Sequence, residues 1–421
     1  QRPWRVLFVS GAKKGLVMTM FSPAAGLPLM ATKLVLSLTL LLSAACQEHA
    51  VEPLQQISGL RVNAVLGDDG QQGFLLAEQP RTFVFPQDHG AHPGYRSEWW
   101  YLTAVLQDAK GNYYGVQFTL FRQALAPQPV GDGPWQTGLV YLAHLALSDV
   151  ARKRHFQAQR LVRGHPQLAS VSVMPSFTAF IEDWSLQAKQ PSLGALQLQA
   201  QDDGWGLSLE MTQTQAIVLQ GLNGLSHKGE GSASYYYSLP RLRTQGVVRR
   251  GAQEERVTGW AWFDREWSTS VLADHLKGWD WMALNLDDGR NIMAFRLRRR
   301  DGRRDEYDHG LLVQSASVAP AVAQKPFIGK TDHGVTLLTP QDFELTPQRY
   351  WQDANRVAWP VQWTLQLGEE TFVIEAMMDD QLMQQTLTYW EGIVVVRNNE
   401  SQNVGSGYLE LTGYGAGDKD D

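Results

Sequence analysis

Polar and apolar residues alternate along much of the chain beyond residue 50. Residues 196–200, 207–211 and 361–367 place an apolar side chain at almost every second position. Because successive side chains of a strand point to opposite faces, this pattern predicts strands with one buried face. No stretch of this region has the spacing of a long amphipathic helix. The pattern therefore predicts an all-β protein.

Turn-forming residues separate several of these strand-like runs. Asp202-Asp203-Gly204 lies between two alternating runs, and Asp288-Gly289 and Asp301-Gly302 each follow one. Asp and Gly favour the backbone angles of tight hairpin turns. Short connections of this kind favour antiparallel pairing, so we expect an antiparallel barrel or sandwich.

Two hairpin-like stretches resemble each other. Residues 100–122 and 281–298 both begin a strand at a Trp, turn at a Gly and return through Phe-x-Leu. We interpret this as a weak internal duplication, with the polar stretch 243–256 as the boundary. The sequence then divides into an N-terminal domain at 81–245 and a C-terminal domain at 255–415.

The N-terminal residues have the features of a bacterial lipoprotein signal. Residues 30–45 comprise a Met, a single Lys, a mostly apolar run and small residues directly before Cys46. The apolar run is shorter than the ~20 residues that a membrane-spanning helix needs. We expect cleavage before Cys46 and lipidation of that residue, with 1–29 upstream of the true start and 46–80 as a linker. Ordinary secretion with an incidental Cys is the alternative.

Composition and charge exclude several classes of protein. The 421 residues are 43% hydrophobic and 19% charged, which is typical of a folded chain. The net charge is −6, and residues 1–45 contain no acidic residue, so the mature part is more acidic still. This charge argues against nucleic acid as a partner. A single Cys excludes an intrachain disulfide and a Cys-based zinc site.

Tryptophans and carboxylates cluster in three regions, 88–101, 259–281 and 389–414. On a strand, Trp260, Trp262 and Asp264 would share one face, and Trp279 and Trp281 another. A carboxyl group among indoles is desolvated, which raises its pKa and suits it to general acid catalysis. Indole faces can also stabilise a carbocation. The alternative is that the tryptophans form the core and that Asp264 pairs with its neighbour Arg265.

Four ordered blocks resemble the AttH/carotenoid 1,2-hydratase-like (CrtC-like) family. They read DHG…EWWY at 88–101, KG…ASYYYS at 228–238, AWFDREW at 261–267 and YWEG at 389–392, and the resemblance spans about 80–415. It implies two lipocalin-like antiparallel β-barrel domains packed together. The family includes carotenoid 1,2-hydratases, which hydrate an isoprenoid double bond without a cofactor. Its AttH branch consists of exported proteins associated with an ABC transport system, some described only as secreted hydrolases.

The resemblance also suggests roles for individual residues. If hydration is retained, the expected acid is Asp264 or Asp280, with Tyr389 or His89 orienting water. The remaining expected residues contact the ligand or flank the cation: Glu98, Trp100, Tyr236, Trp262, Trp279, Trp281 and Glu391.

Other kinds of site are less well supported by the sequence. Asp-His-Gly recurs at 88–90, 308–310 and 332–334, where turns are a better explanation than metal ligands, so we expect neither metal nor cofactor. A Gly-x-Ser-x-Gly nucleophile motif is missing from the sequence.

Two functions therefore remain open. The first is a lipid-anchored protein that binds an apolar isoprenoid- or lipid-like molecule, works with ABC transporter permease components and is anchored through Cys46 on the periplasmic face of a membrane. Gln47 after the Cys weakly favours the outer membrane. The alternative is a cofactor-free hydratase or isomerase acting on such a molecule. A secreted hydrolase ranks third.

Overall fold

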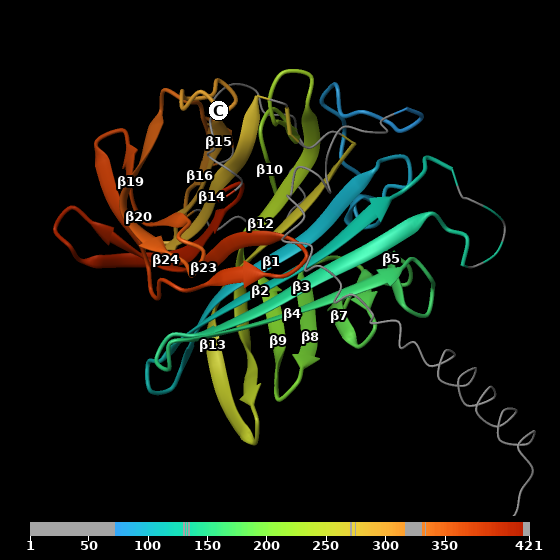
Figure 1. Ribbon diagram of the computed structural model, residues 1–421, viewed down its shortest axis with the longest axis horizontal. Coiled ribbons are helices and arrows are strands. Elements are labelled where there is room, and N and C mark those ends of the chain that lie inside the picture. The colour runs from blue at the N-terminus through green and yellow to red at the C-terminus, as the bar shows by residue number, and fades with distance from the viewer. Residues whose placement is uncertain are drawn as a thin grey trace, which may run out of the picture. The chain divides into compact units, whose positions relative to one another are not determined.

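Antiparallel β-strands make up nearly all of the regular structure, as the alternation predicted (Figure 1). The computed structural model describes residues 72–415 except 129–130, 132, 134, 270–271, 274, 316–330 and 333. The predicted signal, Cys46 and most of the 46–80 linker lie outside the described residues. One short 3-10 helix, η1 (Gln87–His89), precedes the first strand. No helix within these ranges is long and apolar enough to cross a membrane.

The first sheet forms a nearly closed barrel. Its strands pair in the order β4-β3-β2-β1-β13-β12-β9-β8-β7-β6-β5, with β10 and β11 also on β12. The barrel strands are β1 Ser97–Asp108, β2 Tyr113–Ala124, β3 Leu139–Asp149, β4 Arg154–Arg163, β5 Ala169–Ser172, β6 Thr178–Ile181, β7 Trp184–Ala188, β8 Ala195–Asp202, β9 Trp205–Gln213, β10 Val218–Leu219, β11 Leu225–His227, β12 Ala233–Arg250 and β13 Gln253–Ser268.

The second sheet forms a half-barrel. Its order is β17-β18-β16-β15-β14-β24-β23-β21-β20-β19, with β22 on β23. The half-barrel strands are β14 Leu276–Leu286, β15 Asn291–Arg299, β16 His309–Val313, β17 Thr331–Asp332, β18 Val335–Leu338, β19 Phe343–Gln352, β20 Ala358–Leu367, β21 Glu370–Ala376, β22 Leu382–Gln384, β23 Thr388–Asn398 and β24 Asn403–Leu411.

The change from one sheet to the other does not fall at 245–255, where the sequence placed the domain boundary. The polar stretch 243–256 belongs to the long β12–β13 hairpin, whose strands stay paired from Leu242 to the turn. The first sheet continues to Ser268, and the second begins at Leu276. The stretch is polar because the outer end of this hairpin is largely exposed, and not because it is a linker.

The two predicted related hairpins are both present. β1 pairs with β2, and Trp100 lies opposite Leu120. β14 pairs with β15, and Trp281 lies opposite Phe295. The first strand of each hairpin also pairs with the last strand of its own sheet. β1 pairs with β13, and β14 pairs with β24.

Each sheet fills its own interior with alternate side chains. In β1, Trp100, Leu102 and Ala104 point into a large core of the first sheet. A second core belongs to the half-barrel and includes Trp390 and Leu409. Both barrel interiors are therefore packed with side chains.

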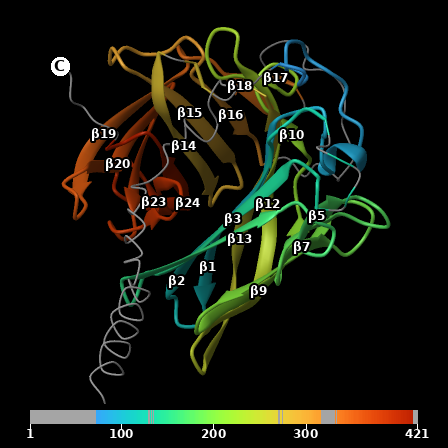
Figure 2. The same cartoon turned by 45° about the vertical axis from the view of Figure 1, so that its right-hand side comes forward.

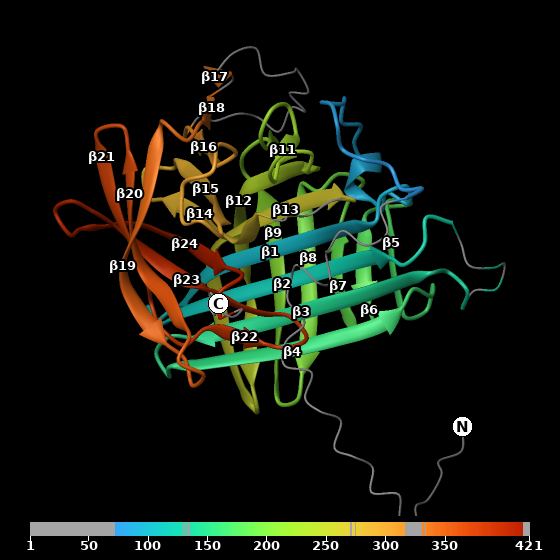
Figure 3. The ribbon, with the colours of Figure 1, turned by 45° about the horizontal axis from the view of Figure 1, so that its top comes forward.

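The two sheets lie against each other (Figures 2 and 3), and the intervening residues of these strands face the other sheet. A third apolar cluster joins Tyr101 and Trp262 of the first sheet to Trp281, Ile393 and Tyr408 of the second. The strands at this junction thus bury both faces, one in a barrel core and one between the sheets.

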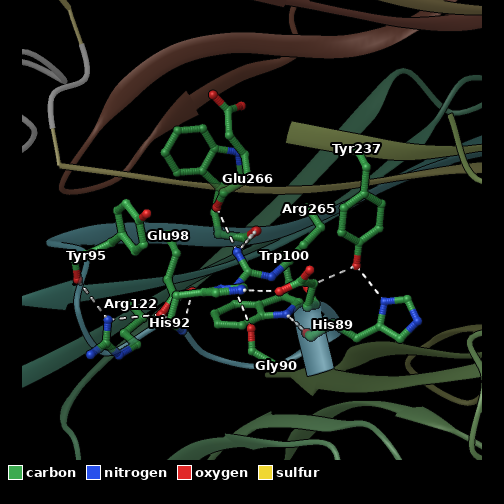
Figure 4. Close-up of polar contacts among 12 residues, drawn as sticks. His89, Gly90, His92, Tyr95, Glu98, Trp100, Arg122, Tyr237, Arg265 and Glu266 are labelled. Atoms are coloured by element: carbon green, nitrogen blue, oxygen red, sulfur yellow. Dashed lines mark hydrogen bonds and ion pairs between the residues drawn. The ribbon is translucent and has the colours of Figure 1, made fainter. Parts of the chain in front are cut away.

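A buried charge network lies at one end of the first barrel (Figure 4). The Arg265 guanidinium lies 4.0 Å from the ring centre of Trp100 and 5.0 Å from that of Trp267. It pairs with Glu98, which also accepts a 2.9 Å hydrogen bond from Arg122. Nearby positive charges, above all Arg265, lower the pKa of Glu98 to about 2 against the effect of its burial. The ion pair therefore ties β1 to β13 at this end of the barrel.

Removing the charge of Arg265 should destabilise the fold strongly. Arg265→Met keeps an apolar stem against the two indoles but leaves Glu98 buried with fewer partners, and we expect a loss of about 3–5 kcal/mol in unfolding free energy. Lys189→Ala, which breaks the exposed pair with Glu210, should cost less than about 1 kcal/mol. Urea denaturation measures both, and equal losses would contradict the structural role of Arg265.

Candidate functional site

A cavity lies between the outer face of the first sheet and the facing side of the second. Its space amounts to about 790 Å³, including the part open to solvent. The first sheet contributes Trp99, Tyr101, Thr119, Phe121, Lys228, Tyr236, Asp264 and Glu266, and the second contributes Trp279, Trp281, Phe295, Leu387, Tyr389, Glu391, Glu410 and Thr412.

The two-residue period of the strands explains this set. Trp99 and Tyr101, Asp264 and Glu266, Trp279 and Trp281, and Tyr389 and Glu391 are all pairs separated by two positions on one strand. Of their neighbours in between, Trp100 and Trp390 belong to the barrel cores. The sequence-based expectation that Trp279 and Trp281 share a face is confirmed.

Asp264 lies in the cavity wall and accepts hydrogen bonds from three side chains. Tyr236 donates to Oδ2 at 2.6 Å, while Trp262 Nε1 at 2.7 Å and Ser238 donate to Oδ1. Burial raises the pKa of Asp264 to about 7, although the three hydrogen bonds oppose this shift. Trp262 does not line the cavity itself and acts through this contact.

Glu391 has fewer partners than Asp264. Tyr101 donates to its Oε1 at 2.5 Å, whereas its buried Oε2 has no hydrogen-bond partner. Burial, followed by the nearby carboxyl of Glu410, raises the pKa of Glu391 well above its usual value. Burial thus favours the neutral form of Glu391, whose acidic hydrogen would face a molecule in the cavity.

Glu410 faces the same space from the neighbouring strand. Trp279 Nε1 donates to its Oε1 at 3.2 Å. Burial raises the pKa of Glu410 to about 7. Unlike Glu391, its side chain keeps some exposure to solvent.

The cation of the cavity, Lys228, is already paired. Its Nζ lies 3.1 Å from Glu266 Oε1 and 4.2 Å from the ring centre of Phe295. Glu266 also accepts a hydrogen bond from Ser234. This pair gives one side of an otherwise aromatic cavity a polar surface.

The Tyr389 hydroxyl is oriented by a buried histidine. It lies 2.8 Å from His144 Nδ1, and His144 Nε2 lies 3.2 Å from Gln159 Oε1. Because an amide oxygen only accepts, Nε2 carries the hydrogen and Nδ1 accepts that of Tyr389. Burial lowers the pKa of His144 to about 4, so the ring is neutral at pH 7. The Tyr389 oxygen is then an acceptor at the cavity wall, which suits the predicted orientation of water.

Asp280 does not reach this cavity, contrary to the expectation that it could be the acid. It lies on the other face of β14, which it shares with Met282 of the half-barrel core. Arg296 Nη2 lies 3.0 Å from its Oδ2, and Tyr414 donates to its Oδ1 at 2.8 Å. The side chain is held by an ion pair inside the second sheet.

Three further predicted residues belong to the barrel end and not to the cavity. Glu98 pairs with Arg265, and Trp100 packs in the first core beneath the same guanidinium. His89 Nδ1 lies 2.7 Å from the Tyr237 hydroxyl (Figure 4). The EWWY block therefore divides between two sites, because Trp99 and Tyr101 face the cavity while Glu98 and Trp100 face inward.

The Asp-His-Gly motifs do not form turns at 88–90 and 308–310, contrary to the expectation from the sequence. Asp88 and His89 belong to η1, and His309 and Gly310 are the first residues of β16. His333 lies outside the described residues. In the described ranges, no group of three or more His, Cys, Asp or Glu is arranged to hold a metal ion.

Sequence reasoning missed several cavity residues. Lys228 and Tyr101 occur in the blocks that carried the resemblance, and Glu410 lies in the 389–414 cluster, but no role was assigned to them. For Tyr101 the available signal was its two-residue spacing from Trp99, to which the sequence had likewise assigned no role. Glu410 had no such signal, because it depends on the pairing between two strands.

A sequence profile of the AttH-like family matches residues 76–414. The chain belongs to the AttH-like family. The resemblance drawn from the four sequence blocks is thereby confirmed. No curated protein matches this AttH-like chain significantly.

Two crystal structures resemble this AttH-like protein over most of its length. An AttH protein from Nitrosomonas europaea is 33% identical, with a TM-score of 0.68, covering 80% of this chain and 99% of its own. Kievitone hydratase from Nectria haematococca is 15% identical, with a TM-score of 0.56, covering 81% and 98% respectively. The second similarity shows a shared fold. The predicted class, two lipocalin-like antiparallel barrels, is confirmed as one nearly closed barrel and one half-barrel.

The raised pKa of Asp264 should appear in the pH dependence of stability. Burial shifts it from 3.8 to about 7, so this group favours folding below its unfolded pKa, and that contribution is lost as pH rises towards 7. Asp264→Asn removes the titration. The unfolding free energy of the variant should therefore rise relative to wild type between about pH 4 and pH 8, by on the order of 4 kcal/mol.

Denaturant titrations at several pH values measure this difference, with Asp203→Asn in an exposed turn as control. The hydrogen bonds that Asp264→Asn loses lower the unfolding free energy of the variant by a similar amount at every pH. They therefore do not change how the difference from wild type depends on pH. A difference that does not change with pH would contradict the raised pKa.

Proposed function

We propose that this cavity binds a largely apolar, unsaturated molecule of isoprenoid type and catalyses hydration or isomerisation of a carbon–carbon double bond without a cofactor. The observation that carries the proposal is the placement of Glu391, a buried carboxyl with an unpartnered oxygen, in an aromatic cavity. Protonating an alkene needs a neutral acid in a dry environment. The shared fold with a hydratase is consistent with this proposal.

Glu391 is better suited than Asp264 to donate the proton. Three donors point at the Asp264 carboxyl, and such hydrogen bonds stabilise the charged form. Glu391 accepts a hydrogen bond from Tyr101 on Oε1, with Tyr389 as the lesser partner, and its buried Oε2 has no partner within hydrogen-bond distance. Asp264 then serves to hold Tyr236 and Trp262 in the wall.

The aromatic residues would stabilise the cation that protonation creates. Trp281 packs edge-on against Tyr101, with ring centres 5.3 Å apart, and Trp279 and Phe295 line the same space. Attraction between a cation and an aromatic face contributes up to about 2 kcal/mol each in a desolvated site. The Tyr389 oxygen is placed to accept a hydrogen bond from the attacking water.

A binding protein without catalysis is the second candidate, since the aromatic lining alone would hold such a molecule. In this form the protein would be exported, anchored to a membrane through lipidated Cys46, on the periplasmic face and preferably at the outer membrane, and would work with ABC transporter permease components. The sequence at residues 30–46 supports export and the anchor. The two candidates differ in one respect, because only catalysis needs the free acid of Glu391.

Substituting the acid should separate turnover from binding. With lycopene as the probe in D₂O buffer, we expect wild type to form a hydrated or isomerised product carrying one carbon-bound deuterium, detected by mass spectrometry. Glu391→Gln should lower the rate by about 10²–10⁴-fold, while quenching of tryptophan fluorescence by the probe stays within a few-fold of wild type.

Glu375→Gln is the matched control, because Glu375 lies on the neighbouring strand β21 and pairs with Arg397 outside the cavity. It should behave like wild type. Binding without deuterium incorporation in wild type would reject catalysis on this probe and favour the binding protein. Undiminished turnover in Glu391→Gln would reject Glu391 as the acid.

A further inference from the structure

Glu391 and Glu410 lie directly opposite each other on neighbouring antiparallel strands. β23 and β24 pair with Glu391 facing Glu410, and both side chains line the cavity. Directly opposed residues have Cβ atoms about 4.5–5.5 Å apart, and like charges there destabilise the sheet. Two negative charges at this separation in a largely buried site cannot both persist without a counter-ion.

Neither carboxyl forms an ion pair within the described part of the cavity wall, and Lys228 lowers the pKa of Glu410 only as the least of the effects that act on it. Lys228 forms its ion pair with Glu266 of β13. The other titratable groups that face the two carboxyls are Tyr101 of β1, Tyr236 of β12, Asp264 of β13, and Tyr389 and Tyr408 of the second sheet. These groups are neutral or acidic, so they add no positive charge.

The two carboxyls differ in their surroundings. Glu391 is 1% exposed, with a hydrogen bond to Oε1 alone. Glu410 keeps more contact with solvent, and Trp279 donates to it. Burial favours the neutral form of both carboxyls, but solvent contact and the indole N–H favour a charged form at Glu410 alone.

We propose that Glu391 and Glu410 share one proton and act as an acid–base pair, in which Glu391 donates to the bound molecule and Glu410 accepts from the water that adds. The catalytic half of this inference rests on the proposed function. It assigns Glu410, to which the sequence gave no role, as the base of the reaction and as the group that restores the acid.

The cycle balances without any external reagent. The Glu391 carboxyl transfers its proton to one alkene carbon, so a C–H bond forms, the π bond breaks, and Glu391 becomes a carboxylate. Water adds through oxygen to the cationic carbon, and its proton passes to the Glu410 carboxylate. Transfer of that proton from Glu410 to Glu391 restores the starting state, and the net change is addition of one water molecule.

The sharing of the proton can be tested on the ligand-free protein. With ¹³C-labelled glutamate carboxyls, NMR titration should show two coupled steps separated by about two pH units or more. Glu410→Gln should lower the midpoint of Glu391 by about one to two pH units, because it removes the neighbouring negative charge. Glu391→Gln should change the midpoint of Glu410 little, because Glu410 ionises while Glu391 is still neutral. Asp308→Asn, at a buried carboxyl outside the cavity, should move neither.

An unchanged midpoint of Glu391 in Glu410→Gln, or two carboxylates at pH 7 in wild type, would overturn the pair. Should Glu391→Gln not fold, Glu410→Gln carries the same test alone. With lycopene, Glu410→Gln should lower the rate at least about tenfold with little change in KM, and a full rate would overturn the role as base. Coupled midpoints without turnover by wild type would reject the proposed function while leaving the shared proton intact.

Discussion

The two-residue period of a β-strand is the constraint on which this structure depends. Strands β1, β13, β14, β23 and β24 each bury both faces, so every residue at the junction belongs either to a barrel core or to the space between the sheets. Filling both barrel interiors leaves the junction as the place where polar groups gather among aromatic rings. The outer face of a barrel thus lines the cavity. The cavity forms because two sheets pack against each other, and not because a barrel is hollow.

Buried carboxyl groups have different partners in the two polar regions of the protein. At the end of the first barrel, Glu98 is buried together with Arg265 and Arg122, and these partners keep its pKa low. In the cavity, Glu391 and Glu410 have no such partner, and burial keeps their pKa values high. The first arrangement stabilises a fixed geometry. The second stores a proton at an apolar surface, which is the property that acid catalysis requires.

Much of the fold could be predicted from the sequence, because alternation, hairpin turns and the family blocks all act locally. The boundary at 245–255 was wrong because a polar stretch can be the exposed end of long paired strands as well as a linker. Asp264 and Asp280 could not be told apart by composition, since only tertiary contacts decide which face of a strand meets the other sheet. The pairing of Glu391 with Glu410 depends on a register shift between Val396 and Arg397. If the register of Arg397 opposite Asn403 continued along the two strands, Leu409 would lie opposite Glu391. A slip of one residue moves side chains to the other face of the sheet.

A crystal structure with farnesol, an unsaturated isoprenoid alcohol, tests the central claim most directly. The account predicts that the molecule lies between the sheets, its apolar chain against Trp279 and Trp281 and a double bond within reach of the free oxygen of Glu391. The first barrel also has a recess at its end, lined by Phe85, His89 and Ile217. Binding in that recess, with the space between the sheets unchanged, would contradict the account.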